Sequence, residues 1–182
     1  MKKFSVKTIV AIGIGAALFF VLGRFVAVPS PVANTTISVQ YGLLAFMSVV
    51  YGPIAGCLIG LIGHALIDLS WGWGIWWSWV LASAVFGLLV GIATKALKLE
   101  EGEIGKKGLI KFNLAQVVCH IVAWGAVAPV LDIFLMGEPA DKVFTQGLVA
   151  GIANAVTTAI VGSLLCVAYA ASKPKAGSLT KE

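Results

Sequence analysis

The chain has 182 residues, of which 59% are hydrophobic and only 12% are charged, and its formal net charge is +5. A soluble domain carries about twice that share of charged residues, so the composition excludes an ordinary soluble protein. Long apolar runs favour an all-α integral membrane protein over a β-barrel.

Six apolar runs predict six transmembrane helices within one transmembrane domain, residues 1–182. The runs cover about residues 8–28, 37–51, 54–69, 76–97, 109–134 and 143–171. The N-terminus resembles the start of a signal peptide, but the run after it is long and no clean cleavage site follows. We therefore expect a retained first helix. The second run is short for a span, which predicts a tilted helix or an upstream extension.

The first run carries small residues at four-residue spacing, which lets another helix approach closely. These residues are Ala11, Gly13, Gly15 and Ala17. Arg24 follows near the far end of the run. Its side chain has two plausible directions, toward the outer membrane interface or inward to a carboxylate, and the first is favoured.

Pro29 and Pro31 end the first helix and predict a polar, extended loop over residues 29–38. Gly52 and Pro53 predict a tight turn between the second and third runs. Further four-residue ladders of small residues predict close helix packing. They are Gly52, Gly56 and Gly60; Gly87 and Gly91; and Gly147, Gly151 and Ala155.

The stretch from His64 to Trp79 is the most informative part of the chain. Five of the six tryptophans lie in its last nine residues. His64 and Asp68 are one helical turn apart and share a face, which Trp71 continues. A tryptophan cluster alone is also typical of a membrane-interface belt. The buried acid and histidine favour a ligand pocket, because polar groups at membrane depth are costly and are often functional.

Polar residues also mark one face of the fifth run and several turns of the sixth. Asn113, Gln116, His120 and Trp124 follow one another at offsets of three, four and four residues. Each polar residue alone is explained by an interhelical hydrogen bond, but their number at similar depth favours a shared cavity. The predicted binding residues are Asn34, Gln40, His64, Asp68, Trp71, Trp76, Trp79, Gln116, His120, Trp124, Gln146 and Asn154.

Six spans place both termini on one side of the membrane. With the termini in the cytoplasm, 11 of the 13 basic residues lie on the inner side, and only Arg24 and Lys142 lie outside. This is the bias that the positive-inside rule predicts for a cell-membrane protein, so the basic charge does not indicate a nucleic-acid partner. The tryptophan-rich loop then faces outward.

No catalytic motif emerges from the sequence. The glycines near residue 105 lack the spacing of a phosphate-binding loop, and no Gly-x-Ser-x-Gly or His-Glu-x-x-His element occurs. We therefore expect no enzyme activity, no metal and no cofactor in this chain. An intramembrane enzyme and a structural membrane subunit with a buried polar cluster remain the alternatives.

Taken together, the length, the six runs, the small residues of the first helix and the outer aromatic cluster resemble the S component of an energy-coupling factor (ECF) vitamin transporter. The opening segment, residues 4–18, resembles a subgroup labelled riboflavin-type or uncharacterised. The resemblance implies a substrate-binding subunit that works with a transmembrane coupling subunit and two ATPase subunits, which use the ATP. It implies that Ala11 and Gly15, with Gly13 and Ala17, face the coupling subunit.

The ligand is expected to be a small heteroaromatic vitamin or precursor, because tryptophan stacks on flat rings. Hydroxymethylpyrimidine, pyridoxine and riboflavin all fit. A small pyrimidine or pyridine is favoured, since few charges are present for a phosphate. Trp71, Trp76 and Trp79 are expected to face the ligand, and Trp73 and Trp77 to face lipid or headgroups.

Overall fold

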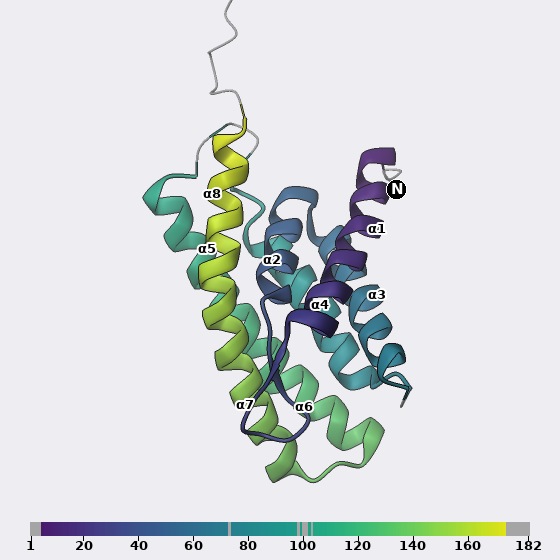
Figure 1. Ribbon diagram of the computed structural model, residues 1–182. Helices are drawn as coiled ribbons and strands as arrows, with labels where there is room; N and C mark the ends of the chain where they lie inside the picture. The colour runs from purple at the N-terminus through teal and green to yellow at the C-terminus, as the bar shows by residue number, and fades with distance from the viewer. Residues whose placement is uncertain (1–4, 73, 98, 100–101, 103, 174–182) are drawn as a thin grey trace, which may run out of the picture.

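The computed structural model describes residues 5–72, 74–97, 99, 102 and 104–173, and the chain forms a bundle of long helices (Figure 1). In chain order the elements, with η marking a π-helical segment, are α1 (Val6–Val21), η1 (Leu22–Val26), β1 (Val28–Pro29), β2 (Thr36–Ile37), α2 (Gln40–Tyr51), α3 (Pro53–Trp71), α4 (Trp77–Ala93), α5 (Gly105–Val122), η3 (Ala123–Val127), α6 (Ala128–Leu131), η4 (Asp132–Met136), α7 (Ala140–Thr157), η5 (Thr158–Gly162) and α8 (Ser163–Ala171). The π-helical segments continue the neighbouring α-helices, so each predicted apolar run contains one continuous helix.

Four of these continuous helices are long and apolar enough to cross a membrane. They are Val6–Val26, Pro53–Trp71, Gly105–Met136 and Ala140–Ala171. The other two, α2 and α4, are apolar but shorter. At 1.5 Å per residue, α2 spans about 18 Å, less than the hydrocarbon core of about 30 Å. The described residues thus provide four helices of spanning length, and six full spans stay a prediction.

Helices α3 and α4 pack closely through glycines, as their ladders predict. A Cβ atom added to Gly87 would lie 2.4 Å from the carbonyl oxygen of Gly56, and one added to Gly60 would lie 2.5 Å from that of Ser83. No side chain fits at such distances, so the two backbones approach as closely as glycine permits. This contact lies toward the Gly52–Pro53 end of α3, away from Trp71.

The small residues of α1 divide between two faces, which corrects the prediction that all four face a partner subunit. Ala11 and Gly15 are buried inside their own bundle, and a Cβ on Gly15 would lie 2.7 Å from Ile59 Cδ1. Gly13 and Ala17 are exposed, and nothing lies within 4 Å of a Cβ built on Gly13. The offset of two residues turns the pairs about 200° apart around the helix.

The predicted polar loop folds as a short antiparallel hairpin, in which Val28 pairs with Ile37 and Pro29 with Thr36. Asn34 adopts a left-handed conformation (φ 59°) in its turn. The hairpin lies at the end of the bundle opposite the start of α1 and the end of α8 (Figure 1). Gln146 Nε2 on α7 donates to the carbonyl oxygen of Ala33 at 2.9 Å, which ties the turn to α7.

Candidate ligand-binding cavity

A cavity of about 430 Å³ lies between the hairpin and the adjoining ends of the helices. Ten of the twelve predicted binding residues line it: Asn34, Gln40, His64, Asp68, Trp71, Trp76, Trp79, Trp124, Gln146 and Asn154. They come from the hairpin and from α2, α3, α4, η3 and α7, together with the Trp76 loop. Segments distant in sequence therefore meet in one space of the size that small-molecule sites occupy.

The other two predicted residues, Gln116 and His120, lie behind the cavity wall, which corrects their assignment. Gln116 Nε2 donates to the carbonyl oxygen of Ala155 at 3.2 Å. The His120 ring stacks on Phe86 at 4.0 Å between centroids, and its Nε2 lies 3.1 Å from Thr158 Oγ1. Their helix face points at the neighbouring helices, so both residues hold the bundle together instead of meeting a ligand.

His120 nevertheless supports one of the lining residues. Trp124 Nε1 donates to His120 Nδ1 at 3.0 Å. Nδ1 is therefore the acceptor, and the neutral ring carries its proton on Nε2, toward Thr158. The Trp124 ring in turn lies 5.3 Å from that of Trp79, with an angle of 30° between the planes, and 5.2 Å from that of Tyr41. These three rings form one aromatic wall.

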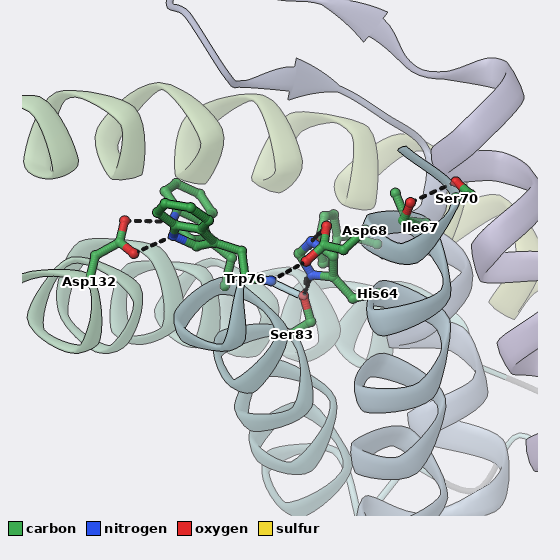
Figure 2. Close-up of polar contacts among 9 residues, drawn as sticks. His64, Ile67, Asp68, Ser70, Trp76, Ser83 and Asp132 are labelled. Carbon is green, nitrogen blue, oxygen red and sulfur yellow. Dashed lines mark hydrogen bonds and ion pairs between the residues drawn. The ribbon is translucent and has the colours of Figure 1, made fainter. Parts of the chain in front are cut away.

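Asp132, which the sequence analysis did not single out, anchors two of the tryptophans that line the cavity, Trp76 and Trp79 (Figure 2). Its Oδ1 accepts from Trp76 Nε1 at 2.6 Å and from Ser78 Oγ at 2.5 Å, and its Oδ2 accepts from Trp79 Nε1 at 2.8 Å. The residue is only 2% exposed. A single acid within the apolar run 109–134 is the signal that could have identified it, because an intramembrane carboxylate is expected to have a specific role.

Asp68 also holds the loop that contains Trp76. Its Oδ2 accepts from the backbone N–H of Trp76 at 2.9 Å, so Trp76 is held by two carboxylates, one at its backbone and one at its indole. Asp68 Oδ1 lies 3.8 Å from His64 Nε2, as the shared helix face predicts. His64 Nδ1 lies 2.6 Å from Ser83 Oγ, and that oxygen lies 3.0 Å from the hydroxyl of Tyr41. Figure 2 shows Asp68, His64 and Ser83 in this arrangement.

Arg24 lines the cavity, at the end of the bundle that is predicted to face outward. Its guanidinium carbon lies 3.9 Å from the centroid of the Trp71 ring, a distance typical of a cation–π contact. Trp77 is 47% exposed and does not line the cavity, as expected of a residue facing the surroundings. Trp73 lies outside the described residues.

π-helical segments carry four of the cavity residues: Gly23 and Arg24 in η1, Trp124 in η3 and Asp132 in η4. π-helical insertions are frequent at functional sites, since they change the direction of the following side chains. One of them, η3, precedes Pro129, whose ring lacks the N–H of a regular α-helical bond. The irregular backbone thus helps to bring these residues to one place.

The rim and the inner end of the cavity differ in their polar pairing. At the rim, Lys142 Nζ donates to Glu138 Oε2 at 2.5 Å. Farther in, Asn154 is 3% exposed, and its Oδ1 accepts no hydrogen bond from the described residues. The described residues bring together no group of three His, Cys, Asp or Glu side chains that could hold a metal.

Known proteins are similar to this chain over nearly its whole length. Residues 3–171 match the family described as "ECF-type riboflavin transporter, S component". A protein of Enterococcus faecalis named "UPF0397 protein" is 49% identical over 181 residues, covering 100% of this chain and 99% of its own. Proteins of the same name from Lactococcus lactis subsp. cremoris and Streptococcus pneumoniae are 50% and 48% identical; they cover 100% and 99% of this chain, and 100% and 98% of their own.

Proposed function

The chain belongs to the family of S components of ECF-type riboflavin transporters, and on that premise we propose that it captures a small heteroaromatic vitamin or precursor from outside the cell. It is a membrane-embedded, substrate-binding subunit that releases this ligand inward. The candidate ligands are hydroxymethylpyrimidine, pyridoxine and riboflavin. The energy comes from ATP that partner subunits hydrolyse.

The observation that carries this proposal is the cavity of about 430 Å³ walled by indole rings. Trp76 and Trp79 are held by Asp132, and Trp124 is held by His120. Rings fixed in this way lose little conformational freedom on binding, so a flat ligand meets a wall that is already formed. Such a wall suits binding of an aromatic ring more than a structural role.

The charge distribution supports capture from outside the cell. The basic residues cluster at the chain termini, in the segment between α4 and α5 and in the first turns of α5, as expected of the cytoplasmic side. The cavity lies at the opposite end of the bundle. The proposed partners are a transmembrane coupling subunit and two ATPase subunits, and the exposed Gly13 and Ala17 of α1 provide a small-residue surface for the coupling subunit.

The competing function is that of an intramembrane hydrolase, because Asp68, His64 and Ser83 follow one another like a catalytic triad. Ser83 is fully buried, however, and is absent from the cavity lining. Its hydroxyl lies between His64 and Tyr41, which use it as a hydrogen-bond partner. A nucleophile must reach the substrate, so this arrangement favours binding over hydrolysis.

The test is to purify the full chain, extract it and identify any bound small molecule by mass spectrometry. We expect a heteroaromatic compound at near-stoichiometric amount in the wild type and in Trp77→Ala, the exposed control. Trp79→Ala should lose it, because that ring belongs to the cavity wall. An empty wild-type protein that also binds none of the three candidate vitamins, or a Trp79→Ala protein with unchanged affinity, contradicts the proposal.

A further inference from the structure

The cavity contains two buried carboxylates without a strong counter-charge. Asp68 is 8% exposed and Asp132 is 2% exposed. Among the described residues, no lysine or arginine nitrogen lies within 4.0 Å of either one, and His64, at 3.8 Å from Asp68, is their only potentially cationic neighbour. Glu138 differs, because Lys142 already neutralises it. Arg24 is the other cation of the lining, so with both carboxylates ionised the lining has a net charge of −1.

Hydrogen bonds satisfy these carboxylates without neutralising them. Asp132 accepts from two indoles and one hydroxyl, all uncharged. Asp68 accepts from a backbone N–H. Burying a charge remains unfavourable until an opposite charge approaches. A positively charged ligand supplies that charge, whereas a neutral or negative ligand leaves the cost in place or raises it.

The aromatic rings that line the cavity also favour a positively charged ligand. The faces of indole and phenol rings carry negative electrostatic potential and attract cations. The Trp71 ring already takes a cation from the protein, the guanidinium of Arg24. Trp76, Trp79, Trp124 and Tyr41 also line the cavity, and of these rings none has a lysine or arginine over it among the described residues. Trp124 and Tyr41 are almost fully buried against other rings, so the half-buried rings of Trp76 and Trp79 remain for a cation from outside.

Asn154 adds an independent sign that a ligand belongs here. It lines the cavity, is 3% exposed, and its Oδ1 has no donor among the described residues. A buried acceptor without a partner is unfavourable. An N–H or O–H group of a ligand would satisfy it.

We propose that this cavity selects a nitrogen heteroaromatic that carries a positive charge or takes up a proton, with Asp68 and Asp132 as counter-charges and the indoles as its walls. This inference rests on the proposed function and narrows its ligand class. Pyridine and amino-pyrimidine rings belong to the class, because each has a basic ring nitrogen. The neutral flavin ring does not.

The experiment compares probes that share one ring and differ in charge: 1-methylnicotinamide (cationic), nicotinamide (neutral) and nicotinate (anionic), with riboflavin added. Equilibrium dialysis on the purified full chain in lipid nanodiscs near neutral pH gives the affinities. We expect 1-methylnicotinamide to bind at least about tenfold more tightly than nicotinamide, the scale of a desolvated cation–π contact, and nicotinate to bind most weakly.

Variants then locate the charge effect. Asp68→Asn keeps an acceptor for the Trp76 N–H but removes the charge, so the cation should lose about tenfold in affinity and nicotinamide much less. Asp141→Asn is the matched control, because Asp141 is an exposed carboxylate of α7 that does not line the cavity, and it should change neither. If Asp68→Asn does not yield a monodisperse protein, the probe ranking on the wild type decides alone.

The possible failures are distinguishable. Equal binding of cation and neutral ring, or tighter binding of nicotinate or riboflavin, overturns this inference and leaves the proposed function standing. Absence of binding by every probe also overturns this inference, and the proposed function falls with it only if the wild-type protein in addition carries no bound compound and binds none of the three candidate vitamins.

Discussion

The two ends of the α3–α4 pair show opposite ways of packing helices. Toward Gly52, the helices meet backbone to backbone through Gly56 and Gly87, where even one added carbon would lie within 2.7 Å of a carbonyl oxygen. Toward Trp71, tryptophans of both helices and of the loop between them line a cavity of about 430 Å³, which the hairpin, α2 and α7 also border. The pair therefore has a closed end, where the two backbones meet, and an open end, which borders the cavity.

This difference shows how the fold keeps a cavity open. Voids are unfavourable in packed interiors, and a bundle lined only by flexible side chains tends to fill them. Here Asp132 fixes two indoles by hydrogen bonds, and the glycine contact fixes the helices that carry them. One end of these helices thus contributes mainly to stability and the other mainly to binding. Substitutions at the first end should lower the unfolding temperature, and substitutions at the second should lower the affinity for the ligand.

The largest effect is expected at the closed end, from Gly87→Leu. Its Cβ alone would lie 2.4 Å from the Gly56 carbonyl oxygen, so α3 and α4 must move apart. We expect a loss of about 3 kcal/mol or more, seen as a large fall in the thermal unfolding temperature of the purified protein. Gly13→Leu, at an exposed position of α1 with open space around it, is the control. Equal unfolding temperatures for both variants would contradict the closed-end argument.

At the open end, Asp132→Asn should impair binding more than folding. The amide presents a donor where one indole N–H needs an acceptor, so one charged hydrogen bond is lost. Such a bond is worth about 1.5–3 kcal/mol, which predicts a loss of about ten- to a hundredfold in affinity for the compound that co-purifies with the wild type.

A double-mutant cycle separates this positioning role from general destabilisation. Trp79→Phe removes the indole N–H that donates to Asp132 Oδ2. In that background, Asp132→Asn should cost clearly less affinity than in the wild type, because a bond already absent cannot be lost again. Equal losses in both backgrounds would mean that Asp132 does not act through Trp79.

The sequence predicted the helices and most of the cavity because both depend on local patterns. The apolar runs gave the six helical segments, and the four-residue spacing placed His64 and Asp68 on one face, 3.8 Å apart. The glycine ladder of α3 and α4 correctly predicted close packing. In each case the relevant period lies within one helix, where geometry fixes which residues are neighbours.

The predictions failed for residues whose surroundings depend on how a neighbouring helix is placed. Gln116 and His120 share a face with Trp124, but the period does not reveal that this face meets η5 and α7 before it reaches the cavity. Asp132 was overlooked because its partners lie 53 to 56 residues earlier in the chain. Arg24 and Asp132 also lie in π-helical segments. In such segments the side chains do not point in the directions that α-helical periodicity predicts.

The smallest effect is expected where the hairpin meets α7. Gln146→Ala removes the hydrogen bond from Nε2 to the carbonyl oxygen of Ala33, one neutral bond worth about 1 kcal/mol. Because this bond holds a segment over the cavity and lies in neither the glycine contact nor the tryptophan wall, we expect ligand dissociation about three- to fivefold faster, with an almost unchanged unfolding temperature. Thr145→Ala, whose exposed hydroxyl bonds only within α7, is the control in the same stopped-flow measurement. A Gln146→Ala protein that releases ligand at the wild-type rate would show that the hairpin does not control exit, and that the open end is closed by the tryptophan wall alone.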